Sequence, residues 1–413
     1  MYELVTICIS LGLLAFLLHL KMRLGRAMLL TAFALAVLLG TAPHMLLQTA
    51  AQEWKSKPLG QTTGYLFVSL TTLLTFVNIL GIALTHTGIS QRLLPSIQGL
   101  FRSRRAALAS IPLMMGMLPT PGGIMLSAPM VRQLGDQIGI ERSRQAALNY
   151  LFRHQWESVW PLFPAVPLIQ GMLGISAADL VLHNLPIMLC GTAAGIIFLL
   201  LPGLPPKQID IRQERFTDNL AGFLHAFWPI GITALLYAAA GITPAAGIIA
   251  VTVLFLILHK VRFKQWVAIF KSGIEFDVVL LILGALLFKL IIESSRSVDA
   301  VVSFLTAMHV PPLFLVFFLP FLVVFLTGLT MPTAAITFPF LVPFIGTGPA
   351  AKLGIETLAF SGIICGLAMT PIHLCLSLSA SYFDTSLLRI IGRMAGPIVS
   401  IAAAGAVMAL MAG

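Results

Sequence analysis

Charged residues are scarce in this chain. Only 10% of its 413 residues are charged and 58% are hydrophobic, whereas soluble domains carry about 25% charged residues. Because no soluble fold could bury so much apolar surface, the sequence predicts a protein embedded in a bilayer. The length allows roughly ten spans of ~20 residues each. The formal net charge of +10 is then attributed to membrane topology, and nucleic-acid binding is excluded.

Cysteine is also scarce, and its positions exclude two further classes of protein. All four cysteines lie inside apolar stretches, without CxxC or Cys/His ligand spacing: Cys8, Cys190, Cys365 and Cys375. We interpret them as packing thiols and expect neither a disulfide framework nor a zinc site. The first twenty residues carry Glu3 and no basic residue, which favours an uncleaved first span over a removed signal peptide.

Long apolar segments predict an all-α polytopic membrane protein. The predicted crossings are 3–20, 27–49, 64–87, 145–172, 177–201, 219–240, 243–259, 276–293, 356–383 and 388–411. Two further apolar pieces, 106–131 and 312–345, are interrupted by proline-containing motifs. The longest hydrophilic connection, 202–217, separates a first unit (1–201) from a second unit (218–413). The basic stretch at 91–105 predicts an amphipathic arm that lies on the membrane surface.

The breaks in these segments occur in matched pairs. Pro332 follows Pro119 by 213 residues, and Pro371 follows Pro161 by 210 residues. The matching order and spacing predict a duplicated unit. Each interrupted piece has arms of only ~20 Å, too short for a ~30 Å hydrocarbon core, so each is predicted to be a re-entrant hairpin.

Five crossings and one hairpin in each unit place the second unit upside down relative to the first. The distribution of basic residues agrees, because loops on the predicted inner side carry many more of them than outer loops. Lys260 lies on the predicted inner side and Lys57 on the outer side, with both termini outside. Two isolated charges near span ends, Asp277 and Lys289, are expected to extend toward the membrane surface.

Broken helices at membrane depth are typical of transporter sites, because freed backbone groups must line a cavity or be buried. Glycine at such a break lets a ligand approach the backbone, and hydroxyls offer oxygen ligands, although many bond back to their own helix instead. The candidate ligand residues near the breaks are Thr120, Gly122, Gly123, Ser127, Ser158, Thr330, Thr333, Thr337, Thr370, His373 and Ser377.

The most polar run inside any span is 153–157, with the sequence RHQWE. Ionisable groups at that depth are costly, and they mark a pathway or pair with one another. Arg153 and Glu157 stand four residues apart and can pair on one helix face. Three interpretations stay open: a structural ion pair, Arg153 as an anion contact, and His154 with Glu157 as a proton-coupling pair.

The motifs MLPTPGG at 117–123 and TMPTAA at 330–335, with the breaks at Pro161 and Pro371, resemble those of the ion transporter superfamily. That group includes the divalent-anion/sodium symporters, the large membrane subunit of dicarboxylate TRAP transporters, arsenite permeases and sodium/proton antiporters. The chain is most similar to an uncharacterised integral-membrane branch of it. Neither tip carries the asparagine of the sodium/dicarboxylate symporters, so the resemblance does not extend to carboxylate specificity.

The resemblance implies an elevator transporter, often a homodimer. The compact loops favour a location in the bacterial inner membrane. The resemblance also implies sodium as coupling ion near Thr120 and Thr333; no other cofactor or metal is expected. The leading hypothesis is secondary active transport of a small anionic solute, coupled to sodium or protons. A cation/proton antiporter using Glu157 and His154 is the alternative. An intramembrane enzyme is disfavoured, because no GxSxG, HExxH or acidic metal cluster occurs.

Overall fold

The computed structural model describes residues 2–89, 96–97, 99–101, 103–117, 124–202, 216–295 and 297–412. Its first half contains α1 (Tyr2–His19), α2 (Leu24–Leu38), α3 (Pro43–Ser56), α4 (Thr63–His86), α6 (Arg104–Gly116), α7 (Ile124–Gln137), α8 (Arg142–Arg153), α9 (Ala165–Leu173) and α10 (Ala177–Ala194). Its second half contains α11 (Phe216–Ala240), α12 (Pro244–Leu258), α13 (Phe263–Gly273), α14 (Phe276–Ser294), α15 (Ser297–Ala307), α16 (Pro312–Thr327), α17 (Thr330–Ile345), α18 (Leu353–Met369), α19 (Leu374–Tyr382) and α20 (Leu387–Ala412). The predicted all-helical, multi-span architecture is confirmed.

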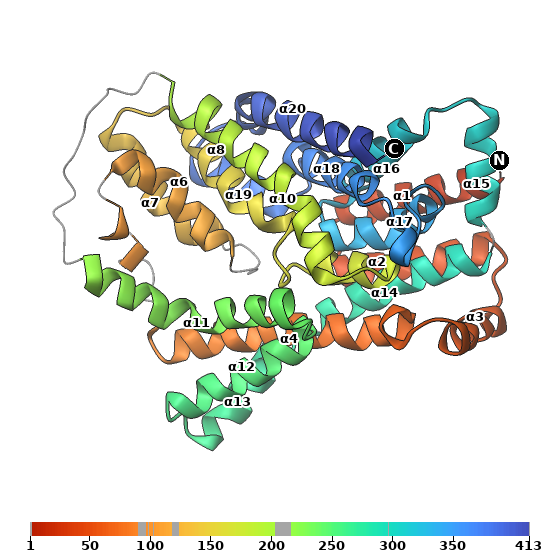
Figure 1. The fold of residues 1–413 in the computed structure, drawn as a ribbon, viewed down its shortest axis with the longest axis horizontal. Helices are drawn as coiled ribbons and strands as arrows, with labels where there is room; N and C mark the ends of the chain where they lie inside the picture. The colour runs from red at the N-terminus through yellow and green to blue at the C-terminus, as the bar shows by residue number, and fades with distance from the viewer. Residues whose placement is uncertain are drawn as a thin grey trace.

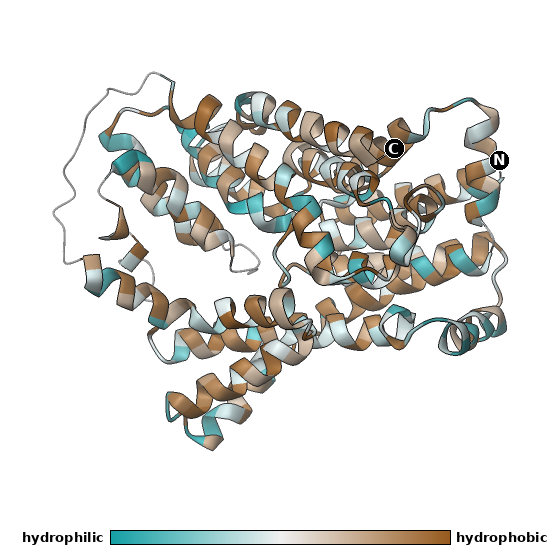
Figure 2. Cartoon of the chain, viewed as in Figure 1, coloured by the Kyte–Doolittle hydropathy of each residue, from teal (hydrophilic) through white to brown (hydrophobic). Residues whose placement is uncertain are grey.

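Several of these helices can cross a membrane. Within the described ranges, six helices are long and apolar enough, or seven if the bent pair α2–α3 counts as one span. Apolar residues also cover much of the outer surface of the helices (Figure 2), as expected for a chain that faces lipid rather than water. The chain is therefore an integral membrane protein, and ten crossings stay a prediction.

Both predicted interrupted pieces consist of two short helices packed against each other. The first pair is α6 with α7 and the second is α16 with α17. Their lengths are 13, 14, 16 and 16 residues, which at 1.5 Å per residue is about 20–24 Å of helix. The pairs lie toward opposite ends of the long axis of the molecule (Figure 1). The first tip, with Thr120, Gly122 and Gly123, lies outside the described residues.

Both predicted broken helices are interrupted as expected. The segment predicted at 145–172 forms α8, a 3₁₀ turn over His154–Ser158, and α9. The segment predicted at 356–383 forms α18 and α19, separated by four residues outside any helix. Pro371 accounts for the end of α18 at Met369, since it cannot donate a helical hydrogen bond, whereas Pro161 and Pro164 lie in the later part of the first interruption.

The segment 27–49, which we predicted as one continuous span, is bent in the middle. It is divided into α2 and α3, which are bent by 106° relative to each other. Gly40 adopts a left-handed φ of +65°, which glycine tolerates readily, and Pro43 is the first residue of α3. Two connections predicted as loops likewise contain helices, namely α13 and α15. Most of the linker predicted over 202–217, and part of the arm at 91–105, lie outside the described residues.

Several helices of the first half pack against helices of the second half. The third long helix of the first half, α4, packs against α12 and α13, whereas α14 of the second half packs against α2 and α3. In the same way α7 packs against α19, and α17 against α9. The start of α1 and the end of α20 lie toward the same end of the molecule (Figure 1). These contacts bring the two broken helices together at the centre of the molecule.

Lys289 does not extend to the membrane surface as predicted. Its side chain is 2% exposed, and its ammonium group lies 3.3 Å from Glu53 Oε1 and 2.9 Å from Glu293 Oε2. It also donates to the hydroxyl of Thr63, at 3.1 Å. Lys57 completes the cluster at 2.9 Å from Glu53 Oε1. Two lysines and two glutamates therefore join α3, the start of α4 and the end of α14.

Asp277 is partly buried and contacts another helix. Its Oδ2 accepts a hydrogen bond from the backbone N–H of Gly25, at 3.1 Å. Gly25 lies in the first turn of α2, whose N–H groups have no partner within the helix. Asp277 therefore caps α2 from the start of α14, rather than extending toward the membrane surface.

Candidate functional site

A cavity of about 760 Å³ lies where the broken segments of both halves meet. Its wall is formed by the break after α8, the start of α9, the α16–α17 connection and the α18–α19 break, with residues of α1, α2, α4 and α14. Its polar and charged lining residues are Arg23, Asn78, Arg153, His154, Glu157, Asp277, Thr327, Thr330, His373 and Cys375. Five of the residues predicted from sequence, namely Arg153, His154, Glu157, Thr330 and His373, therefore come together.

Three helices begin at this cavity. Pro164, Leu329 and His373 line it, and they are the N-cap residues of α9, α17 and α19. None of these three caps accepts a hydrogen bond from its own helix through a side chain. Backbone N–H groups at helix starts lack intrahelical partners and carry the positive end of the helix dipole. The cavity is therefore suited to a negatively charged ligand.

Two imidazoles meet at one side of the cavity. The Nε2 atoms of His154 and His373 are 3.1 Å apart. Their Nδ1 atoms each lie 2.8 Å from a backbone carbonyl oxygen, that of Tyr150 for His154 and that of Gly328 for His373. The ring of Tyr150 stacks on His154 with centroids 4.2 Å apart. Packing and carbonyl contacts thus fix both rings.

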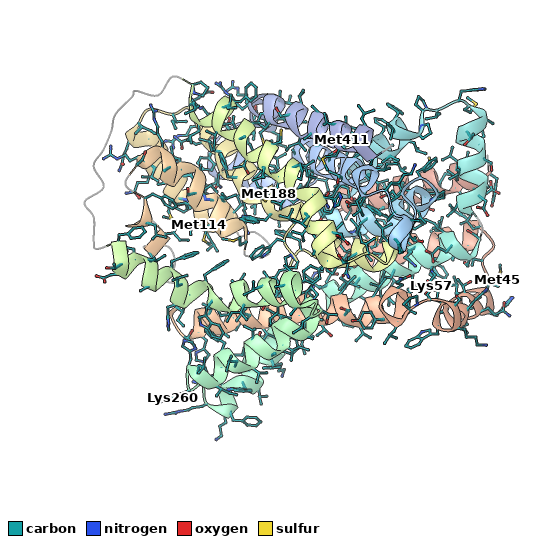
Figure 3. The ribbon with its side chains drawn as sticks, viewed as in Figure 1. Met45, Lys57, Met114, Met188, Lys260 and Met411 are labelled. Atoms are coloured by element: carbon teal, nitrogen blue, oxygen red, sulfur yellow. The ribbon has the colours of Figure 1, made fainter. Side chains whose placement is uncertain are left out.

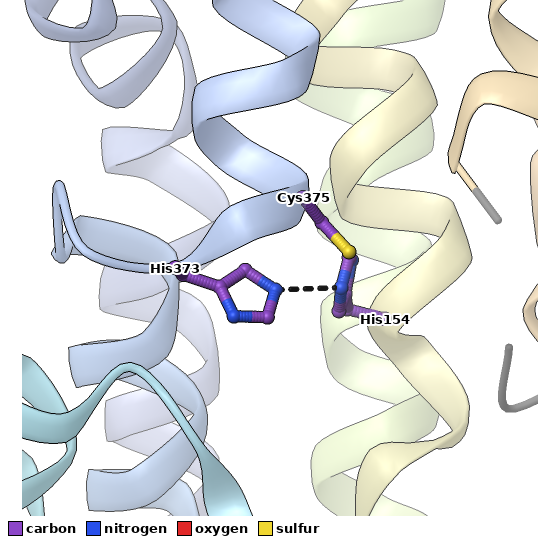
Figure 4. A group of neighbouring side chains, drawn as sticks. All are labelled: His154, His373 and Cys375. Carbon is purple, nitrogen blue, oxygen red and sulfur yellow. Dashed lines mark hydrogen bonds between the residues drawn. The ribbon is translucent and has the colours of Figure 1, made fainter. Parts of the chain in front are cut away.

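Cys375, which we interpreted from the sequence as a packing thiol, also reaches the imidazole pair. It lies in the first turn of α19, two residues after His373. Its side chain points toward the ring of His154 (Figure 4). The thiol sulfur and one nitrogen of each ring lie within 4.8 Å of one another. A His-x-Cys pair is too short a signal to predict this group, because His154 comes from the other half of the chain.

Side chains at the first break cap the first hairpin. Arg153 Nη1 donates to the carbonyl oxygen of Met115 at 2.7 Å, and Trp156 Nε1 donates to that of Leu113 at 2.8 Å. Both carbonyls belong to the last turn of α6, where helical carbonyls lack intrahelical partners. Arg153 therefore has two roles: it binds the end of α6 and it lines the cavity.

The second half uses the same arrangement. Thr370 Oγ1 donates to the carbonyl oxygen of Phe325 at 2.6 Å, and His373 Nδ1 donates to that of Gly328 at 2.8 Å. These carbonyls lie at the end of α16. In each half, two side chains at the break of the broken helix bind the end of the first hairpin helix.

Thr330 and Glu157 form one of the hydrogen bonds that join the two halves in the cavity wall. Thr330 Oγ1 donates to Glu157 Oε2 at 3.2 Å, with 8% of Thr330 and 5% of Glu157 exposed. The predicted pairing of Arg153 with Glu157 stays a prediction. The carboxyl group thus contacts the start of α17, at the tip of the second hairpin.

The other predicted hydroxyls do not line the cavity. Thr333 and Thr337 donate to carbonyls one turn earlier in the chain, at 2.7 and 2.8 Å. Ser127 donates to Asn149 Oδ1 at 2.6 Å, and Ser377 donates to the carbonyl oxygen of Pro371 at 3.0 Å. Ser158 is buried and lies beside a small neighbouring cavity.

A chain with several membrane-length helices, and with broken helices around a cavity, is a polytopic membrane protein. Residues 54–412 match a family model described as "Protein of unknown function (DUF401)". The chain therefore belongs to the DUF401 family. No curated protein matches it.

Proposed function

We propose that the protein is a secondary active transporter that moves a small anionic solute across the membrane. The observation that carries this proposal is the convergence of three uncapped helix starts, those of α9, α17 and α19, on one cavity. Broken helices whose N-termini meet near the middle of a membrane protein are suited to hold an anion. The guanidinium of Arg153, which lines the same cavity, adds a fixed positive charge.

In this proposal, residues 1–201 and 218–413 form two inverted halves. Their reciprocal packing supports it, because α4 contacts α12 and α13 just as α14 contacts α2 and α3. Side chains at the two breaks donate hydrogen bonds to the carbonyl groups at the ends of α6 and α16, and this similarity also supports the proposal. An elevator movement would carry the hairpins and broken helices together against α1–α4 and α11–α14.

Sodium or protons would drive the movement. The second hairpin tip supports sodium, since Thr333 Oγ1 lies 2.7 Å from the carbonyl oxygen of Leu329 and 3.0 Å from Thr327 Oγ1. Clustered carbonyl and hydroxyl oxygens at a helix break are the usual ligands of a coupling sodium ion. The corresponding sodium site at the first tip, near Thr120, falls outside the described residues.

We expect one class of small anions to raise the thermal unfolding midpoint of the purified protein in detergent. A ligand that binds only the folded state stabilises it by about 2.7 kcal/mol at 100 times its dissociation constant. Carboxylates, phosphonates and inorganic oxyanions are tested in sodium and in choline buffer at two pH values. The stabilising anion then serves as the labelled solute for uptake into proteoliposomes.

Arg153→Leu should remove the anion-dependent stabilisation, whereas Arg389→Leu, at an exposed position on α20, should retain it. The comparison uses the ligand-induced increase within each variant, so a lower baseline stability of Arg153→Leu does not affect it. Stability that follows sodium and pH but no anion would contradict anion transport and support the cation/proton antiporter instead.

The inverted arrangement predicts that the ends of the two hairpins face opposite sides of the membrane. In a variant without native cysteines, cysteines introduced at Ser103 and Ala350 should react with an impermeant maleimide from opposite sides. Lys55→Cys, at an exposed position in the last turn of α3, and Lys260→Cys serve as references. Lys57, at the end of α3, and Lys260 lie toward opposite ends of the molecule (Figure 3). If the cysteines at positions 103 and 350 react from the same side of the membrane, the inverted arrangement of the two halves is excluded.

A further inference from the structure

The hydrogen bonds of His154 and His373 determine which ring nitrogens carry hydrogen. A backbone carbonyl oxygen can only accept, so the Nδ1 atom of each ring, 2.8 Å from such an oxygen, must be the donor. In neutral imidazole the other nitrogen, Nε2, is then an acceptor with an exposed lone pair. The two Nε2 atoms nevertheless face each other at 3.1 Å. Two lone pairs at this distance repel unless a positive species lies between them.

The surrounding ligands favour a metal ion over a proton as that species. A proton needs two acceptors, whereas the group also includes the thiol of Cys375, within 4.8 Å of one nitrogen of each ring. Two nitrogens bound to a tetrahedral Zn²⁺ at 2.0–2.1 Å are about 3.3–3.4 Å apart, close to the observed 3.1 Å. Histidine ligands of metals usually donate their second ring N–H to a carbonyl or carboxylate, as both rings do here.

We propose that His154, His373 and Cys375 bind one thiophilic divalent cation of the zinc type at the wall of the central cavity. Each half of the chain contributes to the site, His154 from the break after α8 and the other two ligands from the start of α19. All three residues line the cavity, so the fourth coordination position is open to water or a small anion. The ion would thus connect the two broken helices directly.

Other charged and titratable groups near the site are compatible with a cation. Glu157, on the same break, and Arg153 both line this cavity and have opposite charges. Tyr150 stacks on one imidazole and meets the other edge-on, with centroids 4.2 and 5.8 Å apart. A thiolate ligand would offset one charge of a divalent ion, and the remaining positive charge suits an anion at the open fourth position.

Cobalt(II) is a suitable probe, because its tetrahedral thiolate complexes absorb through sulfur-to-metal charge transfer. Protein purified in detergent and stripped with a chelator should bind one Co²⁺ per chain with that absorption band. Cys375→Ser should lose the band, and His373→Gln should weaken binding at least about 100-fold. Cys190→Ser should retain both the band and the affinity, because the Cys190 thiol donates to the carbonyl oxygen of Ser400 and does not line this cavity.

Zn²⁺ should also raise the unfolding midpoint of the wild-type protein, a result that requires no variant. The proposal would be overturned if folded wild-type protein bound no metal saturably, or if the charge-transfer band persisted in Cys375→Ser. This site does not depend on the transported solute. Anion-dependent stabilisation measured in chelator-treated protein tests transport separately from metal binding.

Discussion

Replacement of Lys289 with methionine is expected to destabilise the folded protein by about 3–5 kcal/mol, as when one partner of a buried ion pair is removed. The wild-type cluster contains two lysines and two glutamates, and Glu53 is only 3% exposed. Without Lys289, two carboxylates would share the single ammonium group of Lys57. The loss should be visible as a lower midpoint of thermal unfolding in detergent.

Two further variants separate the charge effect from the loss of packing. Lys271→Met removes a lysine from an exposed position on α13 and should leave the midpoint nearly unchanged. The double variant Glu53→Gln/Lys289→Met leaves Lys57 and Glu293, 3.9 Å apart, and should recover much of the lost stability. Equal midpoints for Lys289→Met and Lys271→Met would show that the cluster does not stabilise the fold.

The sequence was sufficient to predict the interruptions of the helices, because proline at membrane depth has a direct structural consequence. The breaks around Pro161 and Pro371 are both observed, as are the two short helices of each interrupted piece. The bend between α2 and α3 also had a signal in Gly40 and Pro43. It was missed because hydropathy over a long window does not respond to a single turn.

Contacts between distant parts of the chain could not be predicted in the same way. Lys289 and Glu53 are 236 positions apart, and only the packing of α14 against α3 brings them together. An isolated charge near a span end has the same sequence pattern whether it reaches the surface or a buried partner. Cys375 was interpreted as a packing thiol for the same reason, since its proximity to His154 depends on how the two halves meet.

The close approach of α6 to the break after α8 leads to a second large expected effect. Gly116 faces the carbonyl oxygen of Arg153 so closely that a Cβ at this position would lie 2.2 Å from it. The obstacle is backbone and cannot rotate away. In the second half α16 and α18 also approach closely, but there the glycine is on the broken helix: a Cβ at Gly362 of α18 would lie 2.2 Å from the carbonyl oxygen of Phe317 in α16. Small residues at such positions allow helices in a membrane to approach each other closely.

Gly116→Val should therefore separate the first hairpin from the broken helix. Overpacking of this kind costs about 1–3 kcal/mol, and loss of the Arg153–Met115 hydrogen bond adds about 1.5–3 kcal/mol because its donor is charged. The expected results are a lower unfolding midpoint and loss of the anion-dependent stabilisation. Gly12→Val is the matched control in α1, since a Cβ there would meet no atom within 4 Å.

The two readouts for Gly116→Val distinguish the role of this contact in the fold from its role in the cavity. If the hairpin only supports the fold, the midpoint falls but the protein that stays folded still responds to the anion. If the hairpin also positions the cavity, the response is lost even below the unfolding transition, because Arg153 both lines the cavity and binds the end of α6. We expect the second result. A normal response to the anion would contradict the coupling of the first hairpin to the cavity through Arg153.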